Sequence, residues 1–307
     1  ERSVSAAGFG AAPTCEELRP IAPGELWIGL LPSATGETTL FFVDETGVEH
    51  HAFEAQPSIS SDTVLGVVGA DATLASIDAR IGRSESVHVL GHSSLVRLDV
   101  HALPWRHQPL IASRPVSYRL DLPRAEPTNT APEVGDSPEA PVGQARVRSA
   151  FVVGDPGRNL ASAAAEAESV AETLTARGWE TKTAAGHEVR AESILKGVEG
   201  VDWFHYAGHA ARGENGWSGE LALGHGQRVT AADLYLLRSA PRVAVLAACE
   251  AGGVEGARMT GGLTLATSML LRGSEYVVAP ISKVSDDVAG QFTAAFYEAL
   301  GRTPQVD

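Results

Sequence analysis

Residues 201–210 read VDWFHYAGHA and residues 242–253 read RVAVLAACEAGG, and these two stretches decide the fold. Each is a short apolar run that ends in small residues, a pattern typical of a buried strand followed by a tight loop. A chemically reactive side chain follows each run, His209 in the first stretch and Cys249 in the second. Because active groups gather beyond the carboxyl ends of parallel strands, these two residues form a candidate catalytic pair.

Strands and helices alternate around these two stretches. The helix predictions rest on apolar spacing, as at Val288, Phe292 and Phe296, with Asp286 or Asp287 expected as the N-cap of the last helix. Such alternation predicts a mainly parallel central sheet covered by helices on both faces, an α/β fold. The predicted strands are Ala150 to Val153, Trp179 to Thr183, Val201 to Tyr206, Arg242 to Ala247 and Tyr276 to Ile281; the predicted helices lie near 161–177, 190–198, 230–238, 261–272 and 287–300, with a hairpin near 219–229.

Residues 125–145, AEPTNTAPEVGDSPEAPVGQA, are rich in proline and small polar residues and are predicted to be an exposed linker. The linker separates an N-terminal part, residues 1–124, from a catalytic half, residues 146–307. The N-terminal part is predicted to be a mixed α/β subdomain. Its expected elements are a hairpin of Glu25 to Ile28 and Thr38 to Val43, a helix near 71–82, and strands at 86–90, 95–100 and 116–120.

Composition limits the kinds of molecule that the protein is expected to bind. The formal net charge of −14, with no cluster of lysine and arginine, makes direct nucleic-acid binding unexpected. No apolar stretch is long enough to predict a membrane span, and no signal peptide is expected. With only two cysteines, Cys15 and Cys249, we expect a reducing, cytoplasmic setting and no closed thiolate zinc site. His50 with His51, or His88 with His92, could ligate a metal, but neither spacing matches a known site, so no metal or other cofactor is expected.

The pairing of a thiol with an imidazole has a chemical rationale. A cysteine that attacks a peptide carbonyl needs an imidazole to stabilise the thiolate and then to protonate the leaving amine. The oxyanion also needs hydrogen-bond donors, and the backbone N–H groups of Ala210 and Cys249 lie at suitable turns.

From about Gly24 to Arg302, the chain resembles the CHAT domain, the bacterial branch of the caspase, separase and gingipain clan of cysteine peptidases. The resemblance implies a caspase-like fold, a cysteine endopeptidase that cleaves protein substrates, and a dyad in which His209 is the general acid/base and Cys249 the nucleophile. The ordered segments that carry it are VHVLGHSSLVRLDVHALPW (87–105), FVVGDP (151–156), FHYAGHA (204–210), VLAACEAGG (245–253), GGLTLATSMLLRGSEYVVAPISKVSDD (261–287) and FYEAL (296–300).

Two departures from the caspase pattern remove any expectation of cleavage after aspartate. Ala210 stands where caspases have glycine after the histidine, and Glu250 where they have arginine after the cysteine. Members of the family are commonly joined to sensor domains and act in bacterial stress, cell-death or anti-phage defence. The resemblance therefore implies an activating partner or sensor domain, and the Gly-rich loop after Cys249 is a candidate for a segment that this partner orders.

Three residues are candidates for the substrate pocket: Asp155, Trp217 and Glu250. An acid at Asp155 would select arginine or lysine before the scissile bond, although a turn role in Gly-Asp-Pro-Gly is the stronger interpretation. Trp217 either walls the substrate groove or packs on the sheet edge. Glu214 and Glu220 are weaker candidates for substrate contacts, and His205 and His225 are interpreted as structural.

The sequence was also compared with other catalytic and ligand-binding motifs, and one alternative function is kept. GHSSL at 91–95 resembles a nucleophile elbow with Ser93 as nucleophile, but Leu95 stands where the elbow needs glycine, and a strand-like run follows instead of a helix. The Gly-rich turns match neither a P-loop nor a dinucleotide-binding fingerprint. The alternative function is a catalytically idle scaffold or interaction domain with the same fold.

Overall fold

The computed structural model describes residues 20–32, 37–54, 78–90, 100–102, 104–119, 147–211, 219–249, 251, 264–280 and 283–302. The chain divides into two compact units, Glu1–Pro141 and Val142–Asp307. The predicted linker, residues 125–145, lies outside the described residues.

A five-stranded mixed sheet forms the centre of the first unit, in the order β3-β2-β1-β4-β7. The predicted hairpin is present, since β1 and β2 pair antiparallel with Trp27 opposite Val43, and β4 and β7 extend the sheet in parallel. The strand β3 was not predicted from the sequence. The strands are β1 (Glu25–Pro32), β2 (Glu37–Asp44), β3 (Gly47–Glu54), β4 (Ser86–Leu90) and β7 (Val116–Arg119).

Short turns complete the first unit, and one of them corrects a prediction. The strand expected at 95–100 is wrong at Val100, which lies in the 3-10 turn η2 (Val100–Ala102) and buries its side chain in the core; residues 91–99 lie outside the described part of the chain. Of the helix expected near 71–82, residues 78–83 are described and are helical. The remaining elements are the hairpin β5 (Pro104–Trp105) and β6 (Gln108–Pro109) and the 3-10 turn η3 (Leu110–Ala112).

The second unit is built on a five-stranded sheet in the order β15-β14-β10-β8-β9, in which every pair is parallel. The chain passes from β8 to the edge strand β9 on one side and then returns to the central strand β10 on the other, so strand order reverses between β8 and β10. Ligand sites of open parallel sheets form at such a reversal, beyond the carboxyl ends of the strands. The strands are β8 (Ser149–Gly154), β9 (Glu180–Ala185), β10 (Trp203–Ala207), β14 (Val243–Ala247) and β15 (Tyr276–Val278).

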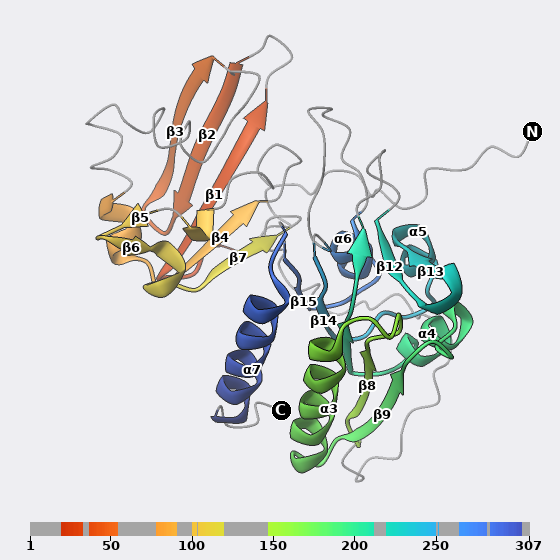
Figure 1. Ribbon diagram of the computed structural model, residues 1–307. Helices are drawn as coiled ribbons and strands as arrows, with labels where there is room; N and C mark the ends of the chain where they lie inside the picture. The colour runs from red at the N-terminus through yellow and green to blue at the C-terminus, as the bar shows by residue number, and fades with distance from the viewer. Residues whose placement is uncertain are drawn as a thin grey trace, which may run out of the picture. The chain divides into compact units, whose positions relative to one another are not determined.

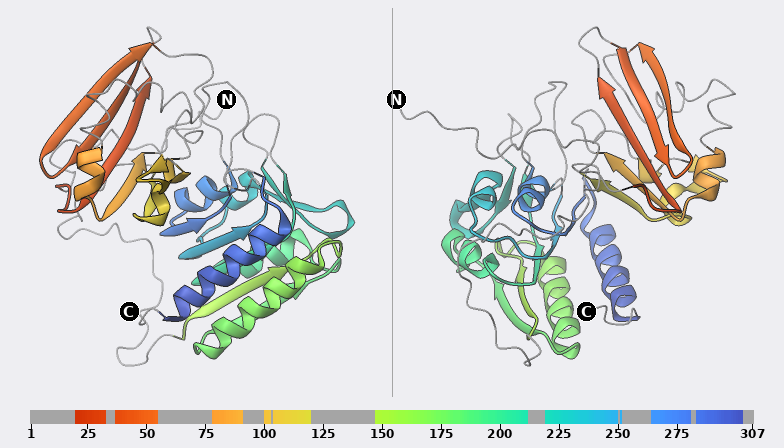
Figure 2. Two further views of the ribbon diagram at one scale, coloured as in Figure 1. Left: turned by 60° about the vertical axis from the view of Figure 1, so that its left-hand side comes forward. Right: turned by 180° about the vertical axis from the view of Figure 1, so that it is seen from behind.

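Helices cover both faces of this sheet (Figure 1). Helices α3 (Ala161–Ala176) and α7 (Asp286–Arg302) run side by side over one face (Figure 2), where Val152, Trp203 and Val245 pack against them. The other face packs on α4 (Ala191–Val198), α5 (Ala231–Tyr235) and α6 (Leu265–Leu271). Burial on both faces explains why β8, β10 and β14 are largely continuous apolar runs rather than alternating ones, whereas the edge strand β9 is polar and mostly exposed.

A small antiparallel sheet follows β10 and carries the chain away from the sheet edge. Its strands are β11 (Ala210–Ala211), β12 (Glu220–Ala222) and β13 (Arg228–Thr230), with the 3-10 turn η4 (Gly224–Gly226) between the last two. The predicted hairpin near 219–229 corresponds to β12 and β13.

Helix termini differ from two expectations. Helix α5 begins at a capping box in which Thr230 and Asp233 bond reciprocally, and it ends at Tyr235, three residues before the predicted end at 238. The predicted aspartate N-cap of α7 is wrong, because Asp286 is already helical and Ser285 Oγ accepts a hydrogen bond from the N–H of Val288 at 3.4 Å. Both aspartates lie instead in the first turn, where the helix dipole favours negative charge.

The predicted fold class is confirmed: the protein is mixed α/β, with a parallel central sheet flanked by helices. Within the described residues, none of the helices has both the length and the apolar character needed to cross a membrane.

Candidate active site

Strand register brings His209 and Cys249 to the same edge of the parallel sheet. Ala207 at the end of β10 is the register partner of Ala247 at the end of β14. His209 and Cys249 each lie two residues beyond these partners. Both residues therefore follow the carboxyl ends of neighbouring parallel strands, at equivalent positions in the strand register. The end of β8 lies level with them, since Gly154 is the partner of Ala207 on the other side of β10.

The loop that carries His209 is fixed through its main chain. The N–H of Gly208 donates to the carbonyl of Ala247 at 3.3 Å, which ties the loop to β14. The carbonyl of His209 accepts from the N–H of Ala222 at 2.9 Å, which ties it to β12. The imidazole itself is exposed. The backbone of this loop is therefore held in place while the side chain of His209 is exposed.

Tyr206 stabilises the loop that carries His209 through its hydroxyl group. Its buried hydroxyl lies 2.9 Å from the carbonyl oxygen of His209 and 2.7 Å from that of Ala222, and it donates its single proton between them. Burial, with a smaller contribution from the negative charge of Asp155, raises the pKa of Tyr206 well above its ordinary value. The phenol thus stays a donor at physiological pH. Gly208 leaves room for it, because a Cβ there would come within 2.8 Å of the hydroxyl oxygen.

Cys249 is half-buried, and its thiol has a main-chain partner. Its Sγ donates a hydrogen bond to the carbonyl of Val284 at 3.1 Å. Val284 belongs to the segment that joins β15 to α7. A donating sulfur carries its proton, so this arrangement is that of a thiol rather than of the nucleophilic thiolate.

Asp155 lies directly beyond β8, and its contacts are those of a turn residue. Its Oδ1 accepts the N–H of Asn159 at 2.9 Å and that of Leu160 at 3.1 Å, just before α3 begins. Its own N–H donates to the carbonyl of Ala207 at 3.0 Å. Asp155 has a φ of 40°, a left-handed conformation in which aspartate is one of the better-tolerated residues.

Comparisons with known proteins assign the family. Residues 70–307 match the CHAT domain. The chain belongs to the CHAT domain family. This is a family of caspase-like cysteine peptidases, and the match begins later than the resemblance at Gly24 had suggested.

Two further comparisons add nothing to this assignment. No curated protein matches the chain. Among solved structures, a flavodoxin of Streptococcus pneumonia TIGR4 is 14% identical, with 50% of this chain and 99% of the flavodoxin covered, at a TM-score of 0.27. A likeness at that level carries no argument about the CHAT domain.

Three candidate substrate-contacting residues lie outside the described residues: Trp217, Glu250 and Glu214. Ser93, the nucleophile of the rival hydrolase interpretation, and Cys15 also lie outside them. Glu220 is described: it lies on β12, and its Oε2 accepts a hydrogen bond from Arg228 at 3.1 Å, a cross-strand surface pair. The candidate metal ligands His51 and His88 contact Glu49 at 2.9 Å and Ser117 at 2.7 Å.

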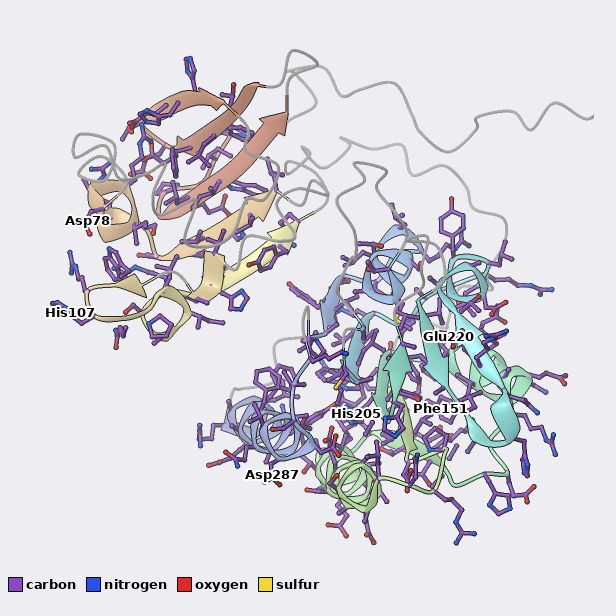
Figure 3. All side chains as sticks on the ribbon, turned by 45° about the horizontal axis from the view of Figure 1, so that its top comes forward. Asp78, His107, Phe151, His205, Glu220 and Asp287 are labelled. Atoms are coloured by element: carbon purple, nitrogen blue, oxygen red, sulfur yellow. The ribbon has the colours of Figure 1, made fainter. Side chains whose placement is uncertain are left out.

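His205, next to Tyr206 in β10, has no exposed surface and lies in the interior of the second unit (Figure 3). Its Nδ1 lies 3.1 Å from the hydroxyl of Tyr297 on α7, which accepts from the indole of Trp203 at 2.8 Å. Its Nε2 is 3.2 Å from Glu166 Oε1 on α3, within ion-pair distance but outside hydrogen-bond geometry. These contacts join β10 to both helices, in agreement with a structural role.

Sequence reasoning did not find the partners of the two candidate catalytic residues. Val284 and Ala222 act through main-chain atoms, for which no residue type gives a signal. The supporting role of Tyr206 had one clue, a tyrosine inside an otherwise apolar strand, because a buried phenol needs a hydrogen-bond partner.

Proposed function

We propose that this CHAT domain is a cysteine endopeptidase that cleaves specific protein substrates through a dyad of His209 and Cys249. The observation that carries the proposal is the register of β10 and β14, in which Ala207 and Ala247 are partners. His209 and Cys249 each follow their partner residue by two positions along the chain. The family match supports the same reaction class.

The proposed reaction proceeds in two steps. The Cys249 thiol transfers its proton to His209, and the thiolate attacks the scissile carbonyl carbon. As the tetrahedral oxyanion collapses, the C–N bond breaks, His209 protonates the leaving amine, and a thioester remains. Water, deprotonated by His209, then attacks the thioester and releases the carboxylate product and the thiol.

The backbone amides of Ala210 and Cys249 are the proposed oxyanion donors. In the β11–β12 ladder, the bond from Ala222 to the His209 carbonyl makes these two residues a hydrogen-bonded pair. Antiparallel pairs alternate, so the next pair, Ala210 with Leu221, is a non-hydrogen-bonded one. The N–H of Ala210 therefore points away from β12 and is available to a ligand.

The contact of Cys249 with Val284 supports a resting state that must be opened. We propose that a sensor domain or an activating partner shifts the segment before α7 and frees the sulfur. A role in a bacterial defence or cell-death pathway, in the cytoplasm, is the proposed setting. Trp217 and Glu250 are proposed to contact the substrate.

The test is covalent labelling followed by cleavage assays on the full chain. A peptide chloromethyl ketone is expected to modify Cys249 and not Cys15, as read by mass spectrometry of the digested protein. Cys249→Ala is expected to abolish cleavage of a positional peptide library while thermal unfolding stays unchanged. Cys15→Ala is the matched control and retains full activity.

Two results would contradict the proposed dyad, and a third would support the alternative function. Labelling of Cys15 alone, or equal cleavage by Cys249→Ala and the unchanged protein, contradicts the dyad. No cleavage and no labelling by a folded protein, even with candidate activating partners present, supports the idle scaffold instead.

A further inference from the structure

A second cluster of chemically capable side chains lies where the loop after β9 meets η4, the turn between β12 and β13. His187, Glu188 and His225 each offer one ligand atom, and these atoms all lie within 4.8 Å of one another. His187 Nε2 is 3.0 Å from Glu188 Oε1, and the two imidazole rings meet edge to face with centroids 5.2 Å apart. Two imidazoles and one carboxylate are the donor set of many zinc sites.

The backbone holds the two loops together independently of these side chains. A Cβ on Gly224 would lie 2.6 Å from His187 Cα and 2.9 Å from the carbonyl oxygen of Pro156, so only glycine permits this approach. Gln227 Oε1 accepts the N–H of Ala191 at 3.1 Å, a second link between the same two segments. The donor atoms are therefore gathered by a fixed framework, which lowers the entropy cost of capturing an ion.

His225 stands in a left-handed conformation with φ of 57°. Such a conformation costs a non-glycine residue about 1 kcal/mol or more and persists where the surrounding structure determines it. In this conformation the imidazole of His225 is exposed and its ring contacts that of His187 edge to face. If this were only a turn, glycine or asparagine at this position would adopt the positive φ with less backbone strain.

The proton arrangement shows where an ion would enter. Arg158 Nη1 lies 3.4 Å from His187 Nδ1, and because a guanidinium can only donate, Nδ1 accepts and the ring proton is on Nε2, facing Glu188. A neutral imidazole that binds an ion through Nε2 carries its proton on Nδ1, so an ion between His187 and Glu188 would move the proton to Nδ1 and replace the contact with Arg158. The positive charge of Arg158 disfavours weakly held cations, so the site selects metals that bond strongly to imidazole over Mg²⁺ or Ca²⁺.

We propose that His187, Glu188 and His225 bind a Zn²⁺ ion, with water as the fourth ligand. Tetrahedral bonds of about 2.0–2.1 Å place neighbouring donors roughly 3.4 Å apart, which side-chain rotation can reach from the present spacing. The ion would fasten the β12–β13 turn to the loop after β9. β12 also holds the carbonyl of His209 through Ala222, but the zinc site rests on its own residues and not on the proposed peptidase.

The test is a zinc titration of the full chain by calorimetry and by competition with a chromophoric chelator. The background protein carries Cys15→Ser, His209→Ala and Cys249→Ala, because thiols and the imidazole of the dyad can themselves hold zinc. In this background we expect one saturable Zn²⁺ per chain, no comparable binding of Mg²⁺, and a rise in the thermal midpoint on adding zinc.

Matched variants separate ligation from folding. His225→Asn keeps a residue that tolerates positive φ, and Glu188→Gln keeps the shape of the side chain; each is expected to weaken zinc binding at least about tenfold and to remove the thermal shift. His107→Asn, at an exposed histidine of the first unit that also has a positive φ, is the control and binds as the background does. Unchanged zinc affinity in both ligand variants, or no saturable binding in the background protein, overturns the proposal.

Discussion

The thiol of Cys249 donates a hydrogen bond to the main-chain carbonyl of Val284, 3.1 Å away. This bond requires a protonated sulfur, whereas attack on a carbonyl requires the thiolate. The segment between β15 and α7 therefore opposes the reaction that the site is proposed to perform, and loosening it should make the sulfur more reactive.

Val284→Gly tests this relationship. Glycine widens the conformations open to the segment, so the carbonyl faces the sulfur for less of the time. Because one hydrogen bond is worth about 0.5–1.5 kcal/mol net, we expect alkylation of Cys249 by iodoacetamide to accelerate roughly two- to tenfold. Val284→Ala removes the side chain but keeps a restricted backbone, and its rate should stay near that of the unchanged protein. Equal rates in both variants would show that the carbonyl does not restrain the thiol.

A pair of histidine variants separates structure from catalysis within β10 and its loop. His205→Ala leaves the Tyr297 hydroxyl and Glu166 without the imidazole, in a buried cavity, so it should lower the free energy of unfolding by about 2–4 kcal/mol. His209→Ala removes an exposed side chain and should change stability by less than about 0.5 kcal/mol, yet reduce cleavage by about 10²-fold or more. Urea unfolding and peptide cleavage are measured on both. A His209→Ala protein that cleaves normally would remove His209 from the dyad.

Asp155 can be tested by separating its charge from its turn geometry. Asp155→Asn keeps an oxygen for the N–H groups of Asn159 and Leu160 and tolerates the positive φ, so we expect normal folding and an unchanged preference in a positional peptide library. Asp155→Ala loses the acceptor, leaves two N–H groups unpaired, and should cost about 1–3 kcal/mol of stability. If Asp155→Asn instead abolishes a preference for arginine or lysine before the cut, the carboxylate belongs to the substrate pocket.

Much of the second unit could be predicted because burial leaves a direct mark on the sequence. The strands that end before His209 and Cys249 are apolar on both faces, and α3 and α7 show regular apolar spacing. The alternation of strands and helices along the chain predicted a parallel sheet. A parallel sheet places the carboxyl ends of β10 and β14 at the same edge. β3 escaped prediction because GVEHHAFE carries charged and imidazole side chains where an apolar run was sought.

The parts of the candidate site that sequence could not predict depend on main-chain atoms and on contacts distant in the chain. Val284 follows Cys249 by 35 positions and meets it through a carbonyl. The cap of α7 fell to Ser285 rather than to an aspartate, because serine and aspartate are nearly equal as caps and the choice rests on where the chain enters the helix.

Two buried phenols predict how stability depends on pH. Burial raises the pKa of Tyr206 and of Tyr297 well above the ordinary value for tyrosine. In the unfolded chain the same groups ionise near pH ~10, so above that pH unfolding releases protons and the folded state loses stability as pH rises. Below pH ~10 both states hold the proton, and the two tyrosines contribute no slope.

The measurement is urea unfolding at several pH values from 9 upward. The slope of stability against pH should decrease by up to about 1.4 kcal/mol per pH unit in each of Tyr206→Phe and Tyr297→Phe, because each removes one proton from the unfolding reaction. Tyr235→Phe, at an exposed position, controls for the loss of a hydroxyl. The single variants should also differ at pH 8: Tyr206→Phe removes the hydroxyl donor from the carbonyls of His209 and Ala222 and should slow peptide cleavage, whereas Tyr297→Phe affects only stability. Slopes identical to that of the unchanged protein would mean that the phenols reach solvent before the chain unfolds.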